Sequence, residues 1–219
     1  MRIIIRYIVL FLCVQILPFS ILRASGKNKN PVFLVHGFCD DDSKMKHIAK
    51  SLLTEGYTVY STKLEPSAGQ LGIDDLALQL NDFIKSNVKD EQRIDLVGFS
   101  MGGLICRYYL QKLNGLCRTD HFISISTPHH GTITAFTLWN KGALQMRYNS
   151  AFLLDLNNDL DKLNTLHFLS IWTPFDLMIV PASSSHVAVG CEKKVNCILH
   201  PLMVSDKYCI NAIKCELLK

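Results

Sequence analysis

The sequence lacks the features that point to a zinc site, a nucleic-acid surface or a multidomain chain. None of its eight cysteines belongs to a C-x-x-C pair, which argues against a structural zinc site. Charge of one sign is scarce: beyond three arginines near the N-terminus, 20 basic residues face 19 acidic ones. A nearly neutral body has no electrostatic footprint for nucleic acid. Internal repeats, low-complexity tracts and linkers are also absent, so the 219 residues predict one domain.

The N-terminus has the composition of a targeting signal. Two arginines precede the apolar run YIVLFLCVQILPF, and the small residues ASG follow at 24–26. The run is short for a membrane span, because an arginine bounds it and Gln15 interrupts it. We therefore predict a signal peptide over residues 1–26 and a mature domain over 27–219, secreted or otherwise outside the cytoplasm. A retained membrane anchor is the alternative.

Export would place the chain in an oxidising compartment, where disulfides persist. Seven cysteines remain after the predicted signal, so at least one stays free or pairs between chains. We expect a disulfide between Cys191 and Cys197, because the polar turn EKKVN between them would bring their Cβ atoms within bonding range. Cys209 and Cys215 fall on different faces of a predicted helix and should not bond to each other. Cys106 should be a buried free thiol in the middle of a helix.

Strand-like and helix-like segments alternate along the chain. The apolar runs PVFLVHGF, YTVYSTKL, RIDLVG, HFISIS and LHFLSIW predict strands, and HVAVG and VNCIL read as short extended pieces. Helical spacing follows several of these runs, residues 133–165 look mostly helical, and a final helix pattern opens at His200. Such alternation predicts a mostly parallel sheet with helices on both faces.

Ser100 stands between two glycines where a strand-like run becomes a helix-like one, in GFSMG. A serine hydroxyl is a poor nucleophile that needs a base and donors for the oxyanion that forms. A sharp strand-to-helix turn would expose the hydroxyl at the carboxyl edge of the sheet, and side chains at Gly98 and Gly102 would collide with neighbouring backbone. The amide of Met101 would lie at the helix N-terminus, where positive potential favours an anion. The pattern predicts a catalytic serine.

Four segments, in order, resemble the small lipases of the α/β-hydrolase superfamily, especially the compact, lidless bacterial lipases. They are PVFLVHGF, GFSMGGLICRYYL, STPHHGT and the segment from Asp176 to His200. The resemblance covers the chain from about Pro31 to its end and is weakest over residues 133–165. It implies an α/β-hydrolase fold with a minimal lid or none, and the order serine, acid, histidine. The cysteine content and Cys39 beside the oxyanion loop depart from the pattern.

Asp176 is the predicted acid, because it follows a strand and the segment FDLMIVP resembles the family's acid loop. Its role would be to orient the histidine and stabilise the imidazolium. By family analogy, the backbone amides of Phe38 and Met101 would hold the oxyanion. Other carboxylates fall on a probable helix and suit a solvated face better: Asp155, Asp159 and Asp161.

Two histidines follow Asp176 and compete for the role of base. His186 lies in the strand-like piece HVAVG, where a side chain would point into a sheet face or to solvent. His200 lies in a loop just before Pro201 and a helix, at the edge where Ser100 and Asp176 should emerge. We predict His200 as the base.

The remaining histidines are expected to have no role in proton transfer. His36 precedes the serine on the first strand and should shape the oxyanion loop. His129 and His130 should line the site from the turn after a strand. The last three read as ordinary surface or core residues: His47, His121 and His167.

These residues favour a secreted carboxylester hydrolase of lipase or esterase type that needs no metal or cofactor. We expect a monomer that acts on acyl esters or lipids, possibly at a lipid surface. An acyltransferase, a thioesterase or a phospholipase could use the same three residues. A binding module that keeps the fold without catalysis is the alternative from another class, and loss of a triad residue would favour it.

Overall fold

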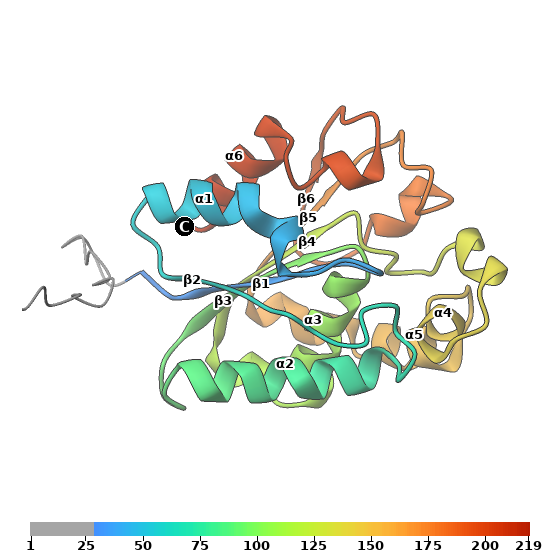
Figure 1. Ribbon diagram of the computed structural model, residues 1–219, viewed down its shortest axis with the longest axis horizontal. Helices are drawn as coiled ribbons and strands as arrows, with labels where there is room; N and C mark the ends of the chain where they lie inside the picture. The colour runs from blue at the N-terminus through green and yellow to red at the C-terminus, as the bar shows by residue number, and fades with distance from the viewer. Residues whose placement is uncertain (1–28) are drawn as a thin grey trace, which may run out of the picture.

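The computed structural model describes residues 29–219, whose strands form one parallel six-stranded sheet. The spatial order is β2-β1-β3-β4-β5-β6, and every neighbouring pair is parallel (Figure 1). The predicted α/β-hydrolase architecture with a mostly parallel sheet is confirmed. The predicted signal peptide, residues 1–26, lies outside the described residues. The strands are β1 Val32–Val35, β2 Val59–Ser61, β3 Ile94–Phe99, β4 Thr119–Ile125, β5 His167–Trp172 and β6 Cys191–Lys194.

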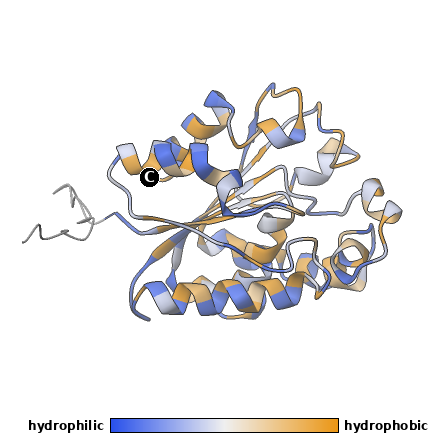
Figure 2. Ribbon diagram, in the orientation of Figure 1, coloured by the Kyte–Doolittle hydropathy of each residue, from blue (hydrophilic) through white to orange (hydrophobic). Residues whose placement is uncertain are grey.

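Helices cover both faces of this sheet (Figure 1). α1 (Lys46–Thr54) and α6 (Lys207–Glu216) pack on one face, and α2 (Ile73–Asn87), α3 (Met101–Lys112) and α5 (Ala151–Asn158) on the other. Figure 2 shows hydrophobic and hydrophilic residues mixed along α1 and α2, as amphipathic helices require. The central strands β1 and β3 are buried along their whole length, as expected of a sheet covered on both sides.

The predicted helical region 133–165 is broken into short pieces. η3 (Ile133–Thr137), α4 (Lys141–Gln145), α5 and η4 (Leu160–Thr165) follow one another. The side chains of Asn140 and Ser150 cap α4 and α5 by accepting hydrogen bonds from backbone amides. α4 and α5 contact α2 and α3, so this segment packs on the same face as those helices. None of the helices in the described region is long and apolar enough to cross a membrane.

Strand β6 departs from the sequence prediction. Neither HVAVG nor VNCIL forms a strand, and the polar segment Cys191–Lys194 pairs with β5 instead. The last helix begins at Lys207, and only a short 3-10 turn, η6 (His200–Leu202), lies where the helix pattern was expected to open. β6 was missed because all four of its residues are exposed, so hydrogen bonding to β5 fixes it without an apolar pattern.

The predicted Cys191–Cys197 disulfide is wrong for this structure, in which both cysteines are free. The expected turn between them is largely strand, and an extended chain rises about 3.3 Å per residue, which carries the two thiols apart. Cys191 is exposed, whereas Cys197 is buried in the core under α6. The other expectations hold: Cys106 is a buried free thiol, and Cys209 and Cys215 stay unpaired on α6.

Candidate active site

Ser100 occupies a strained turn between β3 and α3. Its backbone has φ 54° and ψ −124°, in the left-handed half of conformational space that residues other than glycine rarely enter. The turn is fixed because the amide of Ser100 donates to Ile125 O at 2.8 Å and the amide of Gly103 donates to Ser100 O at 3.0 Å. This geometry places Ser100 at the carboxyl edge of the sheet, as predicted for a nucleophile elbow.

Gly98 and Gly102 permit the tight crossing of strand and helix. A Cβ on Gly98 would lie 2.7 Å from the carbonyl oxygen of Gly102. A Cβ on Gly102 would overlap the carbonyl oxygens of Val35 and His36 at the end of β1. The predicted collision with neighbouring backbone is therefore confirmed, and both glycines allow α3 to approach the sheet.

The loop after β1 lies against Ser100. A Cβ built on Gly37 would be 3.0 Å from Ser100 Cβ, so this loop passes directly beside the turn. Phe38 follows in the next turn, and Met101 begins α3, where the first amides have no partner within the helix. Of the two residues predicted to bind an oxyanion, Met101 directly follows Ser100 and Phe38 directly follows Gly37.

His36 shapes this loop through both ring nitrogens. Its Nε2 accepts from the amide of Leu64 at 3.1 Å, and its Nδ1 lies 3.0 Å from the carbonyl oxygen of Gly37. These contacts are satisfied by a neutral ring protonated on Nδ1. A ring occupied in this way holds the loop, as the sequence predicted.

Asp176 and His200 form a buried pair at the same edge of the sheet. His200 Nδ1 lies 2.7 Å from Asp176 Oδ2, and the other carboxylate oxygen accepts from the amides of Met178 and Ile179 at 2.9 Å each. Burial alone would raise the pKa of Asp176, but the bond from His200 and the amide donors lower it below its ordinary value. The structure brings these two predicted residues together.

The ring of Phe99 links this pair to the serine. Its centroid lies 4.8 Å from that of the His200 imidazole, and Phe99 directly precedes Ser100. The buried Asp176–His200 pair therefore packs against the residue next to the predicted nucleophile, at the carboxyl edge of the sheet. His186, the competing histidine, lies elsewhere: it is exposed and pairs with Glu192 on β6.

Arg107 is a supporting residue that the sequence reasoning missed. It is buried on α3, where it donates to Asn157 Oδ1 at 3.0 Å and to the carbonyl oxygen of Leu156 at 2.9 Å on α5. Burial lowers its pKa to about 9, and none of its described partners is a carboxylate. A cation within the apolar helix pattern GGLICRYYL was the signal available in the sequence.

The turn after β4 is fixed by His129. Its Nδ1 lies 3.4 Å from the Arg107 guanidinium, and its Nε2 lies 3.0 Å from Ser124 Oγ. Burial and the positive charge of Arg107 hold the pKa of His129 well below its usual range, so the ring is neutral. His130 is exposed, and its amide donates to the Ser184 hydroxyl at 3.2 Å. Both histidines hold the turn, in keeping with a supporting role.

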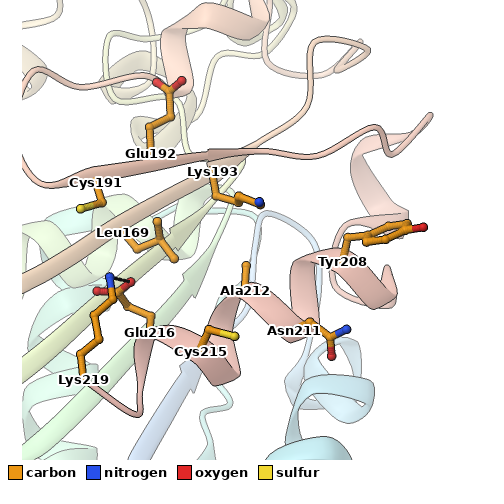
Figure 3. Close-up of a pocket in the computed structure, with 10 residues that line it drawn as sticks. All are labelled: Leu169, Cys191, Glu192, Lys193, Tyr208, Asn211, Ala212, Cys215, Glu216 and Lys219. Carbon is orange, nitrogen blue, oxygen red and sulfur yellow. Dashed lines mark hydrogen bonds and ion pairs between the residues drawn. The ribbon is translucent and has the colours of Figure 1, made fainter.

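The structure also bears on metal binding and on a groove elsewhere in the molecule. Within residues 29–219, no cluster of three or more His, Cys, Asp or Glu side chains is arranged to hold a metal ion. A groove of about 380 Å³ lies between β6 and α6. Figure 3 shows the residues that line it, which include Cys191, Tyr208 and Cys215. Ser100, Asp176 and His200 are not among its lining residues, so this groove is separate from the candidate active site.

Comparison with known proteins gives the family. The sequence profile of the palmitoyl protein thioesterase family matches residues 31–150, more than half of the chain. Human lysosomal thioesterase PPT2 is 28% identical over 127 residues, which are 55% of this chain and 42% of that protein. The mouse lysosomal thioesterase PPT2 is 29% identical over 105 residues, 46% of this chain and 34% of that protein. The chain thus spans less than half the length of the curated relatives it matches.

Solved structures show the same fold. The mature lipase BlEst2 of Bacillus licheniformis superposes with a TM-score of 0.71 at 14% identity, covering 88% of this chain and 93% of that one. At such identity the likeness concerns the fold alone. The match to the family profile, together with the α/β-hydrolase sheet, shows that this chain belongs to the palmitoyl protein thioesterase family.

Proposed function

We propose that this chain hydrolyses acyl thioesters through Ser100, His200 and Asp176. The observation that carries the proposal is the buried 2.7 Å contact between His200 Nδ1 and Asp176 Oδ2, at the edge where Ser100 stands in its strained turn. With Nδ1 donating to the carboxylate, Nε2 is the ring nitrogen left to accept the serine proton. The pKa of Asp176 is lowered, which keeps it ionised to orient the ring.

The reaction proceeds in two halves. Ser100 Oγ attacks the acyl carbonyl carbon while His200 takes the serine proton, and the amides of Phe38 and Met101 stabilise the oxyanion. The tetrahedral intermediate collapses, the bond to the leaving sulfur breaks, and His200 returns the proton to that sulfur. Water then gives a proton to His200 and attacks the acyl-enzyme, which releases the carboxylic acid and restores Ser100.

Membership of the family favours thioesters over the carboxylic esters that the sequence alone put first. The same nucleophile, base and oxyanion donors serve either bond, so the site residues are unchanged between the two. The human and mouse relatives are named lysosomal thioesterases, and a thioesterase is among the alternatives that the sequence leaves open. We therefore propose long-chain S-acyl thioesters as substrates, in a compartment reached by export. Hydrolysis of carboxylic esters is the second candidate.

The test compares a palmitoyl thioester with its oxygen ester, using purified protein. Wild type should hydrolyse the thioester, and Ser100→Ala should reduce turnover on the order of a millionfold, as loss of a triad nucleophile does elsewhere. Ser205→Ala, an exposed serine before α6, is the matched control and should leave turnover unchanged. A serine-reactive phosphonate should label Ser100 in wild type and in the control.

Each other outcome points to a different function. Cleavage of the oxygen ester alone would move the activity to carboxylester hydrolysis. Transfer of the acyl group to an added alcohol would indicate an acyltransferase. If the protein shows no turnover and the phosphonate does not label it, the chain would be a binding module that keeps the fold without catalysis.

A further inference from the structure

An apolar surface lies at the carboxyl edge of the sheet, in the loops that follow β4, β5 and β6. Its side chains come from three loops, at residues 132–139, 173–180 and 195–202, and each is substantially exposed. Trp139, Leu177 and Ile198 have 79%, 74% and 73% of their surface exposed. We call this surface the apolar collar, and it consists of Ile133, Phe136, Leu138, Trp139, Phe175, Leu177, Met178, Ile198, Leu199 and Leu202.

Hydrogen bonds join the three loops into one surface. The Thr132 hydroxyl donates to Met178 O at 2.9 Å, and the amide of Ile133 donates to Val180 O at 3.0 Å. On the other side, the Thr173 hydroxyl donates to Cys197 O at 2.6 Å. Asp176 of the loop at 173–180 also binds His200 of the loop at 195–202, so the loop at 173–180 contacts both of the others. The collar is therefore continuous with the pair at the active site.

The collar carries almost no charge. The three loops contain one carboxylate, that of Asp176, and it is buried against His200. Arg147 lies beside the collar, and its guanidinium covers the rings of Phe136 and Trp139 at 4.9 and 4.7 Å from their centroids. Lys141, the first cation after Trp139, is paired with Asp74 and Asp75. A surface of this kind complements a neutral, apolar partner.

We propose that the apolar collar docks on the surface of a lipid bilayer made of zwitterionic lipids. Soluble proteins rarely expose apolar patches beyond a few hundred Å², and tryptophan, leucine and arginine together are typical of segments that bind the membrane interface. A protein partner fits less well, because protein interfaces pair about one hydrogen bond per 100–200 Å² and several backbone groups of these loops are already bonded to each other.

Docking in this orientation places Ser100 against the membrane. This inference rests on the proposed function, since an acyl chain held in the bilayer could then reach the serine without crossing water. The docking itself involves no bond making, so it is measured separately from hydrolysis.

The experiment measures binding of the full chain to phosphatidylcholine vesicles by flotation, in the Ser100→Ala background so that no turnover occurs. The Ser100→Ala parent, whose collar is unchanged, should float with the vesicles. Lipids brominated on their acyl chains should quench the fluorescence of Trp139. Trp139→Ala and Leu177→Ala should each weaken binding to the vesicles by about tenfold or more, because each variant lacks a large apolar side chain that would move from water into the bilayer. Binding should persist in about 1 M salt, because apolar contact is not screened.

The matched control is Leu53→Ala. Leu53 is also an exposed leucine, but it lies near the end of α1, which runs away from the carboxyl edge of the sheet. This variant should bind vesicles as strongly as the parent, and the melting temperatures of all variants establish that they are folded.

Three results would overturn the proposal: no flotation of the parent protein, equal loss in Leu53→Ala and Leu177→Ala, or binding only to anionic vesicles at low salt. Flotation without thioester hydrolysis by the active chain would instead leave docking intact and refute the proposed function. Thioester hydrolysis without flotation would leave the proposed function intact and refute docking on the bilayer. A peptide or protein that binds the collar while vesicles do not would mark it as a protein interface.

Discussion

Among single residues, the two competing histidines give the most direct test of the site. His200 is buried and bonded to Asp176, whereas His186 is exposed and paired with Glu192. His200→Ala should therefore abolish hydrolysis of a soluble ester, because no other described base contacts Asp176. His186→Ala should change the rate by less than about threefold, since the ring is held in solvent.

Both variants are assayed on the same soluble ester after circular dichroism has established folding. Full activity in His200→Ala would contradict the proposed mechanism, and loss only in His186→Ala would in addition transfer the role of base to His186.

The buried guanidinium of Arg107 offers a second test on a single residue. Arg107→Met removes the donor to Asn157 and Leu156 and leaves polar groups near His129 without a partner. Because an unpaired buried polar group costs about 1–3 kcal/mol, we expect a loss of that size in the free energy of unfolding. Urea denaturation measures the loss. Glu91→Gln, at an exposed charge, is the control and should stay within about 0.5 kcal/mol of wild type.

Between elements, His121 joins β3 and β4 at the edge of the sheet opposite to Ser100. Its Nδ1 lies 2.8 Å from Asp95 Oδ1, its ring stacks on His167 of β5, and Asp120 and Glu216 are near. Burial alone would lower the pKa of His121, but the bond to Asp95 and these negative charges raise it above its ordinary value. Folding therefore favours the protonated ring.

The raised pKa predicts how stability depends on pH. The contribution of His121 is complete below about pH 6.5, the ordinary value, and is lost as pH rises through the higher folded-state pKa. The melting temperature of wild type minus that of His121→Gln should thus be larger at pH 5.5 than at pH 8.5. His47→Gln, an exposed histidine on α1, should show no such difference. A gap between wild type and His121→Gln that is constant with pH would contradict the prediction.

Strands that are buried could be predicted from sequence, and the exposed one could not. β1, β3 and β5 are buried on both faces of the sheet and consist mainly of apolar residues, so their sequences predict them as strands. β6 is polar and exposed, and its place is set by hydrogen bonds to β5 alone. The apolar piece HVAVG was mistaken for a strand because Val187 and Val189 are buried as loop residues in the core. Burial and extended structure are separate properties, and composition reports the first.

The same limit applies to the candidate site. Residues set by local chain geometry, such as Ser100 in its turn and Asp176 after β5, could be placed from sequence. Arg107 could not, because its partners on α5 lie about fifty residues along the chain and only the packing of α5 on α3 brings them together. The apolar collar was also out of reach, because exposure of an apolar side chain depends on what the folded chain leaves uncovered.

For the molecule as a whole, the short pieces between residues 133 and 165 bear on access to the site. α4 packs against α2, and α5 and η4 pack against α3, whereas residues 133–139 carry part of the exposed collar. In the Leu177→Ala variant, whose collar binds lipid weakly, we expect hydrolysis of a short soluble ester to rise smoothly with concentration, without a jump where the substrate begins to form an interface. A large jump at that concentration, in a rate measured across it, would reveal a cover that opens on lipid.

Strand β6 has a consequence for how copies of this chain meet. It is the last strand of the sheet, and one side of it faces no further strand within the described residues. An open edge invites a second molecule to add its own strand, the step from which fibres and swapped dimers grow. Here the edge carries Glu192, Lys193 and Lys194, all exposed, and the like charges of two such lysines would be forced together in a paired edge. This short, charged border lets the sheet end in water at β6 and disfavours the addition of a second strand there.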